Sequence, residues 1–155
     1  MNLPKLHISQ LTQEEKAPME LLLTADPSIE LINSYLKPGS CHIAQLNSEI
    51  VGVLVLNTIN PETLEIKNIA VHESQQGKGI GNALLAYSEK ISRESGYKKL
   101  VIGTGNSSFR QLNIYQKAGF EIDRIKKNYF TDNYEEPIFE NGIQCKHLII
   151  LEKEL

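Results

Sequence analysis

The amino-acid sequence predicts a mixed α/β (α+β) fold, with one central sheet of six to seven mostly antiparallel strands and about four helices. Three strand-like segments at 40–46, 50–57 and 64–71 are joined by short turns, which predicts antiparallel neighbours. A helix opened by glycines then separates the third segment from a strand at 99–103, which predicts a parallel pair with a right-handed crossover. The length of 155 residues suits a single domain over 1–155.

The N-terminal segments predict one short strand and two helices. The strand is expected at 5–9. Thr12 has a glutamate three residues later, a capping-box spacing that predicts a helix over 12–25. Ser28 stands at the N-cap position of a second helix over 28–36, which a Pro-Gly pair ends.

The later elements follow from helical spacing and glycine stops. Apolar residues recur at helical spacing after the glycines at 77–81, and Gly96 ends that helix. Gly119 ends a second helix over 109–118, for which Asn106, Ser107 or Ser108 is the expected cap. The remaining predicted segments are strands at 120–125 and 145–151, separated by an irregular loop at 129–142.

Composition narrows the classes of function. The net charge is −3 and 41% of the residues are hydrophobic, which gives no basic footprint for nucleic acid. No apolar run approaches the length of a membrane span, and segment 1–10 lacks the basic and apolar regions of a signal peptide. Cys41 and Cys145 form no CxxC pair, and no His/Cys cluster has metal-ligand spacing. We therefore expect a cytoplasmic protein with no metal, nucleic-acid or membrane partner.

The most informative segment is a glycine-rich turn at 76–81, Gln-Gly-Lys-Gly-Ile-Gly, which follows a strand and opens a helix. The first amides of a helix lack intrahelical partners, and glycines let an anion approach the backbone closely. A nucleoside-triphosphate loop needs Ser or Thr after Gly-Lys, and a dinucleotide fingerprint needs a third glycine at Asn82, so neither motif fits. Three alternating glycines favour a main-chain anion site over a plain helix start.

Separated pieces of the sequence resemble the GNAT superfamily of acyl-CoA-dependent N-acetyltransferases. An Ile-Ala-Val strand precedes Gln-x-x-Gly-x-Gly at 76–81, and Asn106 is followed by Tyr115 and then Gly119-Phe120. The match covers residues 40–128 well, and the ends agree by topology. The segment 134–143 is similar to that of small uncharacterised bacterial members.

The resemblance implies acetyl-CoA as the co-substrate, held in a cleft where the strand at 64–71 splays from the strand at 99–104. Main-chain groups of Ile69 and Val71 would then pair with the pantetheine arm. Asn106 would bond the same arm, or serve as a helix cap instead. The implied cofactor-binding residues are Ile69, Ala70, Val71, Gln76, Gly77, Lys78, Gly79, Ile80, Gly81, Asn106 and Tyr115.

The resemblance also implies direct transfer to a primary amine of a small molecule or peptide in a ternary complex. Tyr115 matches the tyrosine that protonates the departing thiolate, and its alternative role is core packing. Glu65 stands where some members place a general base, and is otherwise a solvent-facing charge; His72 is the alternative base. The alternative function is a non-catalytic acyl-CoA sensor, for which a thiolate acid would be unnecessary.

Only one part of the sequence, an acidic segment between 132 and 144, gives information about the acceptor. Four acids and no basic residue lie between 132 and 144, which fits either an acidic rim for a cationic acceptor or a merely solvated acidic loop, the latter at least as common. An apolar cluster in the same segment either packs the loop down or forms a homodimer contact. The acids are Asp132, Glu135, Glu136 and Glu140, and the cluster is Tyr134, Pro137, Ile138 and Phe139.

Overall fold

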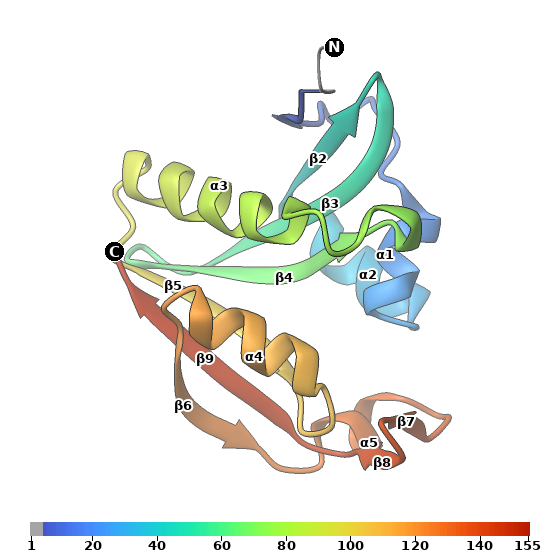
Figure 1. The fold of residues 1–155 in the computed structure, drawn as a ribbon. Helices are drawn as coiled ribbons and strands as arrows, with labels where there is room; N and C mark the ends of the chain where they lie inside the picture. The colour runs from blue at the N-terminus through green and yellow to red at the C-terminus, as the bar shows by residue number, and fades with distance from the viewer. Residues whose placement is uncertain (1–4) are drawn as a thin grey trace.

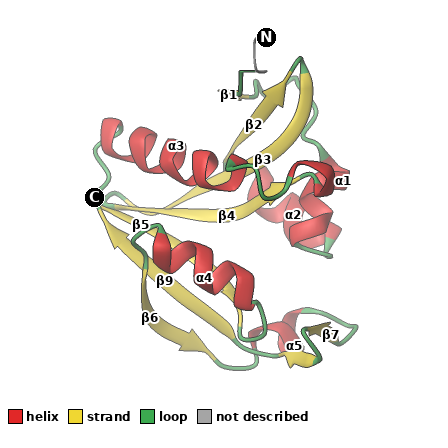
Figure 2. Ribbon diagram, viewed as in Figure 1, coloured by secondary structure: helices red, strands yellow, loops and turns green. Residues whose placement is uncertain are grey.

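A computed structural model of the chain describes residues 5–155, so the first four residues of the segment tested for a signal peptide lie outside it. A seven-stranded sheet in the order β1-β2-β3-β4-β5-β9-β6 forms the centre, and β7 and β8 form a separate hairpin (Figure 2). The elements are β1 His7–Gln10, α1 Met19–Ala25, α2 Ile29–Leu36, β2 Ser40–Leu46, β3 Glu49–Asn60, β4 Thr63–Val71, a 3₁₀ turn Glu73–Gln75, α3 Ile80–Glu94, β5 Lys99–Gly105, α4 Phe109–Lys117, β6 Glu121–Lys126, α5 Tyr129–Asn133, β7 Ile138–Glu140, β8 Ile143–Cys145 and β9 Leu148–Glu154.

The sheet divides into two arms between β4 and β5. These strands form the parallel pair of the sheet, and their pairing runs only from Thr63 opposite Lys99 to Ile66 opposite Ile102. Beyond that point β4 stays with β3, while β5 stays with β9. The arms therefore open into a V, which Figure 1 shows between α1–α2 above and α5 below. The predicted mixed, mostly antiparallel sheet and its splay are confirmed.

A β-bulge sets the direction of the side chains of β4. Val55 of β3 pairs with Asn68, and the next residue, Leu56, pairs with Ile66, so Lys67 is an extra residue. Lys67 and Asn68 consequently lie on the same side of the sheet. Both contact Tyr35 of α2: the Lys67 ammonium lies 5.7 Å from the ring centroid, and the Asn68 amide donates to the hydroxyl over 2.9 Å.

Two apolar clusters cover the two faces of the N-terminal arm. Leu22 and Ile32 of α1 and α2 pack with Val53 and Val55 on one face. The other cluster extends across both arms beneath α3 and α4, and its fully buried members include Leu54, Leu84, Leu100, Ile102 and Leu151. The helices thus cover the two faces of the N-terminal arm, α1 and α2 on one face and α3 on the other.

The predicted helix over 12–25 is wrong in its first half. Glu15 does accept a bond from the amide of Thr12 at 2.9 Å, as the capping-box spacing suggested. The turn does not propagate, because Pro18 has no amide proton and cannot lie inside a helix. Helix α1 begins after Pro18, at Met19. The second helix is confirmed, with the hydroxyl of Ser28 accepting from the amide of Leu31.

The predicted irregular loop over 129–142 and the continuous strand over 145–151 are also wrong. Helix α5 occupies the start of the loop, and β7 and β8 form a hairpin at its end. Asn141 and Gly142 both have positive φ, of 55° and 73°, as a two-residue hairpin turn requires. The last strand is divided because β8 ends at Cys145 and β9 begins at Leu148.

Candidate active site

The glycine-rich turn presents main-chain amides to solvent at the start of α3. Gly77 and Gly79 have φ of 76° and 85°, a conformation that side chains disfavour, and nothing lies within 4 Å of a Cβ at either position. Among residues 5–155, the amides of 77–82 find no hydrogen-bond partner. Open amides at the positive end of a 15-residue helix form an anion site made of main chain.

A groove of about 270 Å³ leads from this turn along the edge of β4 toward α4. Gln76 lies across it: its amide donates to the carbonyl of Val71 over 3.2 Å, and its carbonyl accepts from Arg110 over 2.8 Å. The guanidinium of Arg110 therefore faces the anion site from α4. Arg110 was not predicted from the sequence, although a basic residue in the first turn of a helix is unfavourable and therefore notable.

The wall of the groove is a free strand edge. Residues 68–71 of β4 pair with β3 on one side, but their β5 side is open because pairing with β5 stops at Ile66. Ile69, Ala70 and Val71 line the groove there. An extended ligand can use these main-chain groups as an added strand would.

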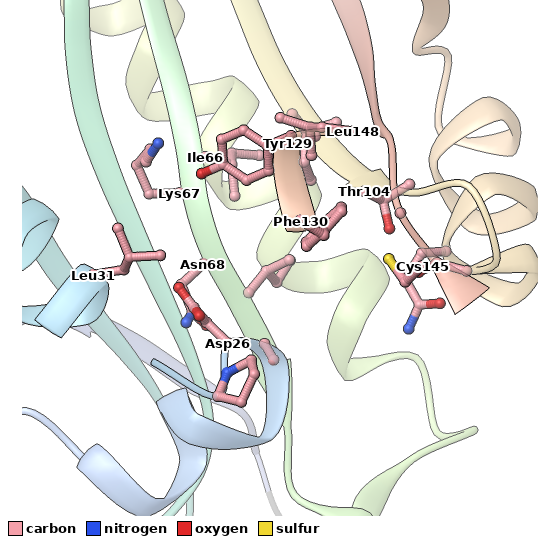
Figure 3. A pocket seen from close by; sticks show the side chains of 18 of the residues that line it. Asp26, Leu31, Ile66, Lys67, Asn68, Thr104, Tyr129, Phe130, Cys145 and Leu148 are labelled. Carbon is pink, nitrogen blue, oxygen red and sulfur yellow. The ribbon is translucent and has the colours of Figure 1, made fainter. Parts of the chain in front are cut away.

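A larger cavity of about 680 Å³ fills the V between the arms. Figure 3 shows Lys67 and Asn68 on one wall, Thr104 and Cys145 on the other, and Phe130 between them. Its carboxylates come from three separate elements, and Lys67 is the one basic side chain among the described residues that line it. The carboxylates are those of Asp26, Glu65 and Glu140. Such a lining favours a cationic ligand.

Asp26 joins the two arms across the mouth of this cavity. Its carboxylate accepts from the hydroxyl of Tyr35 over 2.9 Å and from the hydroxyl of Tyr134 over 2.7 Å. Burial raises the pKa of both phenols well above their usual range, and the bonds to Asp26 raise the pKa of Tyr134 further. The Asn68 amide oxygen is buried beside this network and finds no hydrogen-bond partner among residues 5–155.

Tyr115 lies where the groove and the cavity meet. Its side chain lines both, as do those of Ile69 and Gln111 and residues 24 and 25. The residue is 7% exposed, and its hydroxyl makes no hydrogen bond within the described part of the chain. Burial raises the pKa of this phenol well above its usual range, so it holds its proton at neutral pH.

Two other predicted site residues, Asn106 and His72, form hydrogen bonds within the protein. The Asn106 amide oxygen accepts from the amides of Lys146 and His147, over 2.8 and 2.9 Å, so it fixes the link between β8 and β9. The N-cap of α4 is Ser108, so the alternative of a capping Asn106 is wrong. His72 is exposed, and its Nδ1 accepts from the amide of Ser74 outside both cavities.

The acidic segment contributes less to the cavity than expected. Of its four acids only Glu140 lines the cavity, where it accepts from the hydroxyl of Ser108 over 3.1 Å. The other three, Asp132, Glu135 and Glu136, are exposed. Glu65 does line the cavity, 3.5 Å from the ammonium of Lys67. Cys145 lines it as well, but burial raises the pKa of its thiol, so it is not a thiolate nucleophile.

A main-chain anion site that opens along a strand edge toward an acidic cavity suits an enzyme with two substrates, one of them anionic. The model of the acetyltransferase (GNAT) family matches residues 8–120. The uncharacterised N-acetyltransferase YvbK of Bacillus subtilis strain 168 is 43% identical over the whole of both chains. The chain therefore belongs to the GNAT acetyltransferase family.

Solved structures of relatives hold acetyl-CoA or CoA. A GNAT family acetyltransferase from Elizabethkingia anophelis with acetyl-CoA bound is 52% identical, with a TM-score of 0.95 over 97% of this chain and 98% of that one. A B. subtilis acetyltransferase in complex with CoA is 43% identical, with a TM-score of 0.91 over 97% and 99%. The chain is an N-acetyltransferase that takes its acetyl group from acetyl-CoA, and nothing favours the non-catalytic sensor.

Residues 5–155 contain neither a metal-binding cluster nor a membrane-spanning helix. No group of three or more His, Cys, Asp or Glu side chains there could hold a metal ion. No helix in that range is long and apolar enough to span a membrane.

Proposed function

We propose that this protein acetylates a primary amine of a small cationic molecule or peptide, with both substrates bound at once. The observation that carries the proposal is the meeting of two differently built spaces at Tyr115. The groove offers main-chain amides and Arg110 to an anion, while the cavity offers carboxylates to a cation. A thioester in the groove and an amine in the cavity would react at their junction.

In this proposal the donor is held mainly by backbone. The amides at 77–82 bind the pyrophosphate, with Gln76 placing Arg110 beside it. The open edge of β4 at Ile69 and Val71 pairs with the pantetheine arm. The contact of Asn106 with that arm stays a prediction, because its amide oxygen is already used by the β8–β9 link.

The reaction would use one base and one acid. The acceptor ammonium gives a proton to Glu65, directly or through water, and the free amine attacks the thioester carbonyl carbon. A main-chain amide of β4 stabilises the oxyanion. When the intermediate collapses, the C–S bond breaks, Tyr115 gives its proton to the sulfur, and the nitrogen, as it becomes an amide, returns its second proton through water to the Tyr115 phenolate. Glu65 and Tyr115 suit these roles because both line the cavity and only Tyr115 also lines the groove.

The acceptor proposal is tested by substrate charge. A panel of primary amines, matched in size and either neutral or carrying a second cationic group, would be incubated with acetyl-CoA while free thiol is recorded. We expect kcat/KM to be at least tenfold higher for the dications. Asp26→Asn should remove most of that preference, whereas Glu136→Gln, at an exposed position of the acidic segment between 132 and 144, should keep it. Equal rates for neutral and dicationic amines would refute the cationic acceptor.

We also propose that the protein acts in the cytoplasm as a homodimer. Its two cysteines are unpaired, as is usual in a reducing compartment. Within the apolar cluster that was expected to form a dimer contact, the Tyr134 hydroxyl donates to Asp26, so this side chain packs within its own chain. Phe139 stays exposed and is available to a second copy.

A further inference from the structure

The outermost strand of the C-terminal arm, β6, has one unpaired edge. It is the last strand in the order of the sheet, and within residues 5–155 its one partner strand is β9 (Figure 1). All six of its residues are exposed, and Ile122 and Ile125 are 52% and 55% exposed. Free amides and carbonyls beside exposed isoleucines form an edge on which another strand can pair.

The sequence of β6, Glu-Ile-Asp-Arg-Ile-Lys, is complementary to its own reverse. If two copies pair antiparallel about a twofold axis between Asp123 and Arg124, every residue faces a suitable partner. Glu121 faces Lys126 of the second copy, Asp123 faces Arg124, and Ile122 faces Ile125. Opposite charges and apolar pairs facing each other across antiparallel strands are stabilising, and like charges are destabilising.

A β-bulge brings the two isoleucines to one face of the strand. Residues three apart on a regular strand lie on opposite faces. Here Ile122 pairs with Leu151 and Ile125 pairs with Ile149, because Asp123 is an extra residue in the ladder. Leu151 and Ile149 are two apart, so both isoleucines lie on their side of the sheet. Two copies would therefore bring four isoleucines together on one face.

We propose that β6 is a homodimer interface, in which two copies join edge to edge into one continuous sheet. This inference rests on the proposed homodimer and names its surface; it does not depend on the acetyl transfer. Charges on an edge strand usually prevent pairing. On β6 they are arranged so that they repel most strands but attract an inverted second copy.

The dimer should be weak and sensitive to salt. Six residues give a contact only about 20 Å long, which is small for a stable interface. In the monomer Arg124 bonds its own neighbour Asp123 over 2.7 Å, and that pair would be exchanged for the same pair between copies. We therefore expect association in the micromolar range that weakens as ionic strength rises.

Sedimentation velocity of the full chain from about 5 to 500 μM, an estimated range bracketing a weak dimer, tests the proposal. Wild type should shift from a 17.4 kDa monomer toward twice that mass. Glu121→Lys and Lys126→Glu each place like charges face to face, so each alone should weaken association at least tenfold. Mixed together, the two variants should form a heterodimer, because every facing pair is again opposite in charge. Glu49→Lys, the same charge change on an exposed strand residue of the other arm, should associate like wild type.

Native mass spectrometry of the mixture resolves the heterodimer from each variant alone. A wild type that stays monomeric over the whole range would overturn the proposal. So would a Glu121→Lys variant that associates like wild type, or a mixture that forms no heterodimer. Acetyl-transfer activity is read separately, so failure of the interface is distinguishable from failure of the proposed reaction.

Discussion

Replacing Tyr115 by phenylalanine should separate catalysis from stability. The hydroxyl makes no hydrogen bond within residues 5–155, so its removal breaks no observed bond, and the free energy of unfolding should change by less than about 1 kcal/mol. A general acid contributes about 10²- to 10⁴-fold to a rate, so kcat should fall by that factor. The KM for acetyl-CoA should stay within about threefold, because the amides at 77–82 are unchanged.

Tyr87→Phe is the matched control, with the opposite expected result. The Tyr87 hydroxyl contacts the buried His42 Nδ1 over 2.8 Å, and Tyr87 lines neither the groove nor the larger cavity. Losing that bond should cost about 1–3 kcal/mol of stability and leave kcat unchanged. Both variants are compared by urea unfolding and by thiol release from acetyl-CoA. If Tyr115→Phe kept kcat within about threefold of wild type, Tyr115 would not be the acid.

Three further predictions follow from the same geometry. Arg110→Gln should raise the KM for acetyl-CoA about tenfold with little change in kcat, measured by initial rates. Gly79→Ala and Gly142→Ala should each lower the free energy of unfolding in urea by about 1–2 kcal/mol, because both glycines have positive φ and open surroundings. Only Gly79→Ala should also weaken CoA binding, measured by calorimetry. Burial lowers the pKa of His42 to about 4, below its value in the unfolded chain, so between these two pKa values the unfolded chain binds one more proton than the folded protein. The free energy of unfolding should therefore fall by up to about 3 kcal/mol as the pH drops from 6.5 toward 4. His42→Gln should flatten this pH dependence.

The open turn that we propose as the donor site could be predicted from the sequence because its residues are contiguous. One strand, one turn and one helix start are continuous at 69–81, and the glycines mark where backbone must be exposed. The acceptor cavity could not be predicted in the same way. In the sequence, Asp26 marks only the end of a helix before Pro27. In the structure its carboxylate accepts hydrogen bonds from the hydroxyls of Tyr35 and Tyr134, which lie 9 and 108 residues away in the chain. Arg110 was missed for the same reason, since its partner Gln76 lies on another element.

The bulge at Lys67 explains how one strand can line both the groove and the larger cavity. In a regular strand Glu65 and Ile69 would share a face, because side chains alternate. The extra residue reverses the alternation: Leu64 and Ile66 join the cluster beneath α3, and Ile69 packs against that cluster too. Lys67 and Asn68 are released toward α2 instead, where both meet Tyr35. A strand with no bulge would therefore lose either the core contact of Ile66 or that of Ile69, so the acidic cavity and the donor groove depend on one inserted residue that no local motif marks.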